Sequence, residues 1–185
     1  MFINYTPHLL LATLAGRAIA SPTPVNEAKA LLTAPQAGIA DGTYFVDLNE
    51  DGTTNYTVIT PEAILKGRAA SLNTPKAGSA LVARGSRAHC SNHGVDAASL
   101  AGAQRAFAEM CGNGYWFNSR AIAQVWGSAI AYGCNYGNGQ TCHSADVWSF
   151  YGGIDNGCGY ASAGWWSMEE WKASYGREVN PAGYC

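Results

Sequence analysis

The six cysteines of this 185-residue chain constrain its fold more than any other feature of the sequence. All of them lie at or after residue 90, at Cys90, Cys111, Cys134, Cys142, Cys158 and Cys185. An even number of cysteines behind an export signal is typical of disulfides formed in an oxidising compartment, and not of metal ligands or redox thiols. The sequence therefore predicts three disulfides in an exported protein.

The first twenty residues have the pattern of a cleavable signal peptide. Leu9–Leu14 is a short apolar run, and Ala18-Ile19-Ala20 before Ser21 matches a cleavage site. The run is far shorter than the about 20 residues of a transmembrane helix, and no later stretch is long enough to span a bilayer. We expect residues 1–20 to be removed and the mature chain to be secreted into the extracellular space, without a membrane span.

The charge of the chain argues against a nucleic-acid partner. The formal net charge is −2 at pH 7, and without residues 1–20 the chain keeps ten Lys and Arg against thirteen Asp and Glu. Proteins that bind nucleic acid or anionic lipid use a basic surface to neutralise phosphate groups. Neither kind of partner is expected here.

Composition changes sharply near residue 90. Residues 21–89 contain five of the seven prolines but no cysteine or tryptophan, whereas residues 90–185 contain all six cysteines and all six tryptophans. We expect residues 90–185 to form a stable disulfide-crosslinked domain. Residues 21–89 are interpreted as an N-terminal segment or propeptide that this domain does not need in order to fold.

The N-terminal segment contains two β-prone runs, Thr43–Val46 and Tyr56–Ile59, separated by the hairpin signal Asp51-Gly52. We predict a two-stranded hairpin, which is marginal alone and either packs on the later domain or belongs to a propeptide. The sequon Asn55-Tyr56-Thr57 lies in it, and we predict that Asn55 is exposed and glycosylated.

Two groups of residues have partial metal-site patterns. Asp47–Gly52 has the spacing of a calcium-binding loop, but Val58 stands where the loop needs a bidentate Glu, so we interpret it as a hairpin turn. Three histidines lie close to cysteines, namely His89, His93 and His143. Export turns those cysteines into disulfides and removes them as zinc ligands. We expect no metal and no cofactor.

Two helices are predicted between residues 90 and 160. Asp96 caps the first, which ends at Gly112 and carries on one face Leu100, Ala103, Phe107, Met110 and Cys111. Ser144 caps the second, which ends at Gly159 and has a core-facing stripe of Val147, Phe150, Tyr151, Ile154 and Cys158.

Three strands are predicted around them. Ala121–Trp126 and Ala129–Tyr136 are joined by a turn at Gly127-Ser128, and the tail Trp165–Tyr175 includes a further strand, with Met168–Lys172 as a candidate helical turn. Period-two alternation puts four residues of the second strand on one face, namely Ile130, Tyr132, Cys134 and Tyr136. The predicted fold is α+β, with two helices covering one face of a small antiparallel sheet.

The tryptophans are the best candidates for a binding surface. Trp126 and Trp148 are expected in the core of a domain that is poor in Leu and Val. Trp165 and Trp166 are adjacent, so on a strand one of them faces outward, and together with Trp171 they form the candidate surface for a sugar ring or a protein.

No catalytic residue is predicted. Glu169-Glu170 is the one place where acids meet these tryptophans, but adjacent carboxylates on a strand point to opposite faces and cannot both act on one substrate. Export leaves no free thiol to act as a nucleophile.

The C-terminal pattern resembles known secreted proteins. Gly127–Gly137 (GSAIAYGCNYG), then Cys142, a helix over Asp146–Ile154, the ending Asn156-Gly157-Cys158-Gly159 and a terminal Cys185 are similar to the killer-toxin-like and necrosis-inducing effector families of small fungal proteins. The resemblance covers about residues 90–185. The killer toxins have more cysteines and a basic active surface, whereas this domain is acidic, and Gln124 stands where that family often has a cysteine.

The resemblance implies a secreted, non-enzymatic toxin or effector that acts on a competing microbe or a host, through a cell-surface or extracellular target that is a protein or a glycan. We do not extend the channel-blocking activity of the killer toxins to this chain. Two alternatives stay open. One is an extracellular protein that binds or hydrolyses wall glycans through the C-terminal tryptophans, and the other is a structural protein of a wall or spore coat.

The residues constrain the disulfide pairing in part. Cys142 and Cys158 flank the second helix and would lie about 24 Å apart at about 1.5 Å per residue, whereas a disulfide allows about 7 Å between Cα atoms. Cys111 and Cys134 both lie on stripes expected to face the core, which predicts that they pair. The family resemblance implies Cys90–Cys158 and Cys142–Cys185.

Overall fold

The computed structural model describes residues 32, 38–73 and 85–185 and shows an α+β fold. Its elements are β1 (Gly42–Leu48), β2 (Thr54–Val58), α1 (Pro61–Ser71), β3 (Arg87–Gly94), α2 (Ala97–Cys111), β4 (Tyr115–Phe117), β5 (Ala121–Trp126), β6 (Ala129–Asn135), β7 (Gln140–Cys142), α3 (Ser144–Cys158), β8 (Ser162–Met168) and β9 (Ala173–Val179). The predicted signal peptide and its cleavage site lie outside the described residues.

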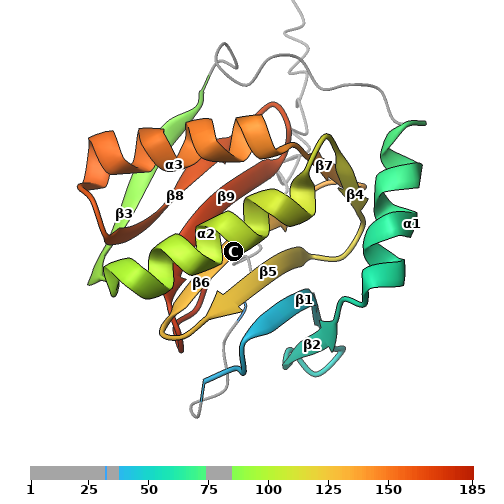
Figure 1. The fold of residues 1–185 in the computed structure, drawn as a ribbon, viewed down its shortest axis with the longest axis horizontal. Helices are drawn as coiled ribbons and strands as arrows, with labels where there is room; N and C mark the ends of the chain where they lie inside the picture. The colour runs from blue at the N-terminus through green and yellow to red at the C-terminus, as the bar shows by residue number, and fades with distance from the viewer. Residues whose placement is uncertain (1–31, 33–37, 74–84) are drawn as a thin grey trace, which may run out of the picture.

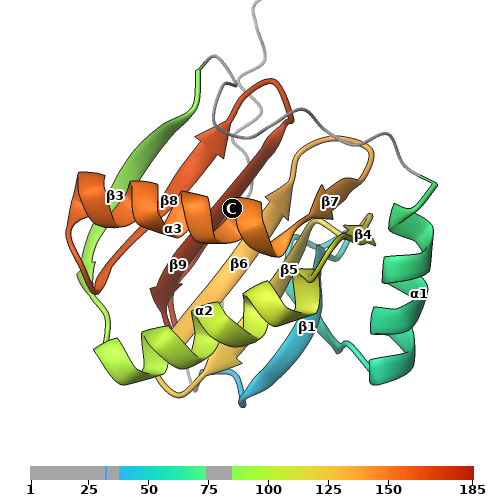
Figure 2. The same ribbon diagram turned by 45° about the horizontal axis from the view of Figure 1, so that its top comes forward.

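One large sheet organises the fold. Its seven antiparallel strands run in the order β2-β1-β5-β6-β9-β8-β3, while β4 and β7 form a separate two-stranded sheet. Helix α2 packs on β5 and β6, and α3 packs on β3, β8 and β9, so both helices cover the same face (Figure 1). Helix α1 lies beside the small sheet (Figure 2), and its Arg68 donates a hydrogen bond of 2.8 Å to the Glu109 carbonyl in the last turn of α2. The predicted class and the two covering helices are confirmed, but the sheet is larger than expected.

The helices begin and end where local signals favour it. In α2 the Asp96 side chain accepts a hydrogen bond from the Ser99 backbone N–H at 2.8 Å, and Gly112, at φ 51°, ends the helix as predicted. Helix α3 ends at Gly159, but His143 and not Ser144 is its N-cap residue. Helix α1, which was not predicted, begins with Thr60 as a side-chain cap. No helix in the described ranges is long and apolar enough to cross a membrane.

Strands β5 and β6 form the predicted hairpin at the centre of the sheet. Every residue of β6 is buried. Its side chains alternate between two separate apolar clusters, with Ala129 and Ala131 in the helix-side core and Ile130, Tyr132 and Cys134 on the opposite face. The middle strands of the sheet are therefore buried on both faces, whereas the prediction had helices covering one face only.

The N-terminal hairpin is part of this sheet. Strand β1 pairs with β5 from Gly42, opposite Val125, to Val46, opposite Ala121. Val46 is fully buried in the second cluster. The boundary predicted at residue 89 falls inside β3, which pairs with β8 at the other edge of the sheet. Residues on both sides of the predicted boundary thus build the same sheet.

Two of the tryptophans predicted for the core lie at the surface. Trp126 is 50% exposed and Trp148 is 47% exposed, so this prediction was wrong. Trp126 is the last residue of β5, where the strand leaves the core, and it rests on Gly102 of α2. Trp148 lies off the buried stripe of α3 and meets Tyr151 edge-on.

Three disulfides crosslink the fold, as predicted in number. Cys90–Cys158 joins β3 to the end of α3, in agreement with the resemblance. The other two expected pairs were wrong, because Cys111 pairs with Cys142 and Cys134 pairs with Cys185. Cys134 shares the face of Tyr132, opposite α2, and so it cannot reach the end of that helix.

The buried position of Val46 gives a test of the hairpin. Replacing Val46 with alanine should lower the free energy of unfolding by about 2 kcal/mol, because apolar volume is lost from a closed core. Chemical denaturation measures the change. Val58, in the next strand and 62% exposed, is the matched control, and V58A should change stability by less than about 0.5 kcal/mol. Equal and small effects would contradict the role of β1 in the core.

The disulfide pattern gives a second test. A non-reducing digest of the secreted protein, analysed by mass spectrometry, should contain the linked peptides Cys90–Cys158, Cys111–Cys142 and Cys134–Cys185. A Cys111–Cys134 peptide would contradict the two-faced sheet, because it would place Cys134 on the helix side.

Candidate functional site

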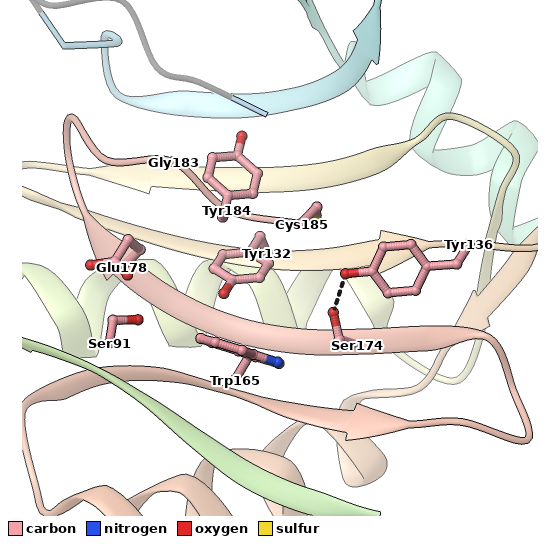
Figure 3. A pocket seen from close by; sticks show the side chains of 9 residues that line it. All are labelled: Ser91, Tyr132, Tyr136, Trp165, Ser174, Glu178, Gly183, Tyr184 and Cys185. Carbon is pink, nitrogen blue, oxygen red and sulfur yellow. Dashed lines mark hydrogen bonds between the residues drawn. The ribbon is translucent and has the colours of Figure 1, made fainter. Parts of the chain in front are cut away.

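The sheet face opposite α2 and α3 carries a row of residues across four neighbouring strands. Tyr132 on β6 pairs with Gly176 on β9, Gly176 pairs with Trp165 on β8, and Trp165 pairs with His89 on β3. Residues directly opposite each other in antiparallel strands point to the same face. Two residues of this row, Tyr132 and Trp165, line a pocket of about 210 Å³ (Figure 3).

Tyr132 lies at the bottom of the pocket. A Cβ atom at Gly176 would lie 2.5 Å from the hydroxyl oxygen of Tyr132, so a residue without a side chain is needed for the ring to lie across β9. The ring also stacks on Tyr184, with centroids 4.7 Å apart. Burial raises the pKa of Tyr132 well above its ordinary value, and the Glu178 carboxylate adds to this shift. The hydroxyl therefore stays protonated.

Trp165 forms one wall and is supported by His89. The two rings are parallel to within 7°, with centroids 4.9 Å apart, and Nε2 of His89 lies 3.0 Å from the Ser167 hydroxyl oxygen. Burial lowers the pKa of His89, and the Arg87 guanidinium lowers it further, which favours the neutral imidazole. Since His89 covers one face of the indole, the other face is directed toward Tyr132 and the pocket (Figure 3).

Glu178 and Ser91 lie together at one end of the pocket (Figure 3). Glu178 is 3% exposed. Its Oε1 atom accepts a hydrogen bond from the Val179 backbone N–H at 3.0 Å and lies 2.8 Å from Nδ1 of His93. A buried carboxylate persists only where donors surround it, and these two groups supply them.

Residues 183–185 form the opposite wall. Tyr184 exchanges backbone hydrogen bonds with Leu32, each 2.9 Å long, and its hydroxyl donates to the Tyr56 hydroxyl at 3.2 Å. The disulfide of Cys185 with Cys134 ties the next residue to β6. These contacts hold Tyr184 in place beside Tyr132.

The pocket combines aromatic walls with hydroxyl groups and a carboxylate. At the end away from Glu178, the hydroxyls of Tyr136 and Ser174 lie 3.0 Å apart and bond each other. Within the described part of the chain, the Tyr132 hydroxyl forms no hydrogen bond. Such a site can hold a small group by stacking and hydrogen bonding together.

The structure separates the three tryptophans of the predicted binding surface. Trp165 lines the pocket. It was expected that one of the adjacent residues Trp165 and Trp166 would face away from the helices, because neighbouring residues of a strand point to opposite faces. Trp166 lies on the opposite face, with its ring against Gly153 of α3. Trp171 lies in the turn between β8 and β9 and meets Phe150 edge-on in the helix-side core.

The other residues singled out in the sequence lie outside the pocket. Glu169 and Glu170 lie exposed in the turn between β8 and β9 and not on a strand. The segment with calcium-loop spacing is part of a hairpin, as interpreted, and in its turn Asp51 accepts hydrogen bonds from Thr53. Nδ1 of His143 lies 2.9 Å from the Asn113 carbonyl oxygen. The described residues contain no group of three or more His, Cys, Asp or Glu side chains that could hold a metal ion.

Of the nine lining residues, sequence reasoning named only Trp165 as a binding residue, and those it missed include Ser91, Glu178 and Tyr184. Ser91 lies on β3, which was not predicted as a strand because its sequence is mostly polar. Glu178 gave one detectable signal, because period-two alternation places this charged residue on the same face as the small residues Ser174 and Gly176. Tyr184 reaches the pocket only through tertiary contacts.

Comparisons with protein-family models, with curated proteins and with solved structures found no match to this chain. The resemblance drawn from the sequence pattern is therefore a hypothesis, and the function is inferred from the geometry of the pocket.

The contact between Gly176 and Tyr132 can be tested directly. Replacing Gly176 with alanine should displace the Tyr132 ring and lower stability by about 1–3 kcal/mol, because the added Cβ overlaps the ring. Thermal unfolding and near-ultraviolet circular dichroism measure the two effects. The control is Gly152→Ala on α3, where a Cβ meets nothing within 4 Å, and this change should raise stability by up to about 1 kcal/mol. An unchanged spectrum and stability for G176A would contradict the packing.

Proposed function

We propose that this chain is an exported, non-enzymatic protein of the toxin or effector type. It acts outside the cell on a competing microbe or a host, and it does so by binding a group of its target in the pocket formed by Tyr132, Trp165, Glu178 and Tyr184. The pocket is the observation that carries the proposal. Its walls are held by ring stacking and a disulfide, so a ligand would not have to order them.

Extracellular action is supported by the crosslinks. Three disulfides fit a secreted or extracellular protein, because they persist where thiols are not kept reduced. Asn55, the predicted glycosylation site, is exposed on β2. The apolar run and cleavage pattern of the first twenty residues agree with export.

Binding is favoured over hydrolysis by the state of Glu178. Glycoside hydrolysis uses two carboxyl groups about 5–10 Å apart across the scissile bond. Among the described lining residues Glu178 has the one carboxylate side chain, and it is already held by His93 and the Val179 N–H. Because both donors reach Oε1, the Oε2 atom is left to accept hydrogen bonds from a ligand.

Secretion and surface binding of the protein test this proposal. Protein recovered from the culture medium should begin at Ser21, and the fluorescently labelled protein should bind to the surface of fungal, bacterial or plant cells and inhibit growth or cause leaf necrosis. Protein that has been reduced and alkylated is the control and should lose both effects, because the wall containing Cys185 is released. Retention inside the producing cell, or the absence of surface binding on all three cell types, would overturn the proposal.

A further inference from the structure

We propose that the pocket binds one neutral pyranose ring of an extracellular glycan, stacked on Trp165 and hydrogen-bonded at the Glu178 end. This inference rests on the proposed function, because it names the group of the target that the pocket would take. It goes beyond that function in assigning a chemical class to the ligand and a role to each lining side chain.

Trp165 presents the flat apolar surface on which the C–H face of a sugar ring can pack. Its indole lies parallel to the His89 ring, which covers one face, and it is only partly buried. The uncovered side lies within the pocket (Figure 3). Because the stacking fixes the indole before a ligand arrives, binding would cost little of its rotational freedom.

The Tyr132 hydroxyl lies at the pocket, and the described residues supply no hydrogen bond to it. Tyr132 is 2% exposed, and its hydroxyl points toward Trp165 (Figure 3). The oxygen atom is not one of the fully enclosed unpaired atoms of the described residues, so a ligand in the pocket can reach it. A ligand hydroxyl placed over Trp165 would complete the missing hydrogen bond.

The Glu178 end supplies the complementary groups. Both protein donors to this carboxylate reach its Oε1 atom, and Oε2 has no hydrogen bond within the described part of the chain. The Ser91 side chain, which can donate and accept, lies next to it. Sugar hydroxyls also donate and accept, so they match this mixture of groups.

The same residues favour a neutral ring over an ion. A cation bound by aromatic faces needs several open faces. Tyr132 already stacks on Tyr184 and packs on Gly176, which leaves Trp165 as the main open face. An anion would meet the Glu178 carboxylate, and none of the described lining residues is basic.

The volume of the pocket suits one sugar unit. Pockets for drug-sized ligands measure about 300–1,000 Å³, whereas this one measures about 210 Å³. A longer glycan would therefore place a single ring in the pocket and extend over the surface of the sheet.

Calorimetric titration tests the proposal. The secreted protein is titrated with the methyl glycosides of glucose, mannose, galactose and N-acetylglucosamine, and with choline chloride as the cation probe. At least one glycoside should bind, and choline should not. Binding of choline alone, or of none of the glycosides, would overturn the proposal.

Three variants locate the bound sugar. W165A should weaken binding at least tenfold, and Y132F, which keeps the ring and removes only the hydroxyl, should weaken it by about tenfold. W148A removes an exposed tryptophan from α3 on the other side of the sheet and should leave affinity within about twofold of the wild type. If W165A and Y132F fold normally and bind as tightly as W148A, the sugar lies elsewhere and the proposal is wrong.

Surface binding by the same variants separates this inference from the proposed function. If W165A and Y132F lose glycoside binding and cell-surface binding together, both proposals hold. If the protein binds cells and none of the glycosides, the target group is not a sugar and only this inference fails. If the wild-type protein does not bind cells at all, the proposed function fails, whatever the titration shows.

Discussion

Burial of strand β6 on both faces is the constraint on which the rest of the structure depends. All seven of its residues are buried, and its apolar side chains alternate between two clusters. A strand of this kind needs a cover on each side. Helix α2 covers one face, and Tyr184 with the buried residues of β1 covers the other. The disulfides follow this division, since Cys111–Cys142 lies with the helix layer and Cys134–Cys185 holds the second cover.

Strand β9 extends this arrangement by burying two consecutive charged residues, one in each layer. Arg177 is on the helix side, where its Nη2 lies 2.6 Å from Oδ1 of Asp155 and its Nε donates to the Ser162 carbonyl at 2.7 Å. Glu178 is on the pocket side with His93. Buried charges are tolerated when they are paired in this way. The first pair joins α3 to the sheet, and the second joins the pocket to β3.

The pocket exists because the second cover is narrower than the first. Among the described residues, Tyr184 lies over Tyr132, whereas Trp165 on β8 is only partly buried and lines the pocket (Figure 3). The space between these aromatic residues is bounded by hydroxyl groups and by Glu178 (Figure 3). Tyr184 closes the core over Tyr132, and the pocket lies beside Tyr184, next to Trp165.

The sequence by itself determined the elements whose signals are local. Asp96 and Gly112 mark the ends of α2 because a cap and a stop act on neighbouring backbone groups, and the turn at Gly127-Ser128 joins β5 to β6 for the same kind of reason. Alternation along β6 also correctly grouped Tyr132 with Cys134.

Only the tertiary structure decided which layer covers each group. Period-two alternation states which residues share a face of a strand, but nothing local states whether a helix or a distant chain segment lies over that face. For this reason Cys134 was wrongly paired with Cys111, and the contribution of Tyr184 to the pocket was missed. The hairpin at β1 posed the same problem, because its own residues favour a strand pair while its place beside β5 depends on contacts about 80 residues away along the chain.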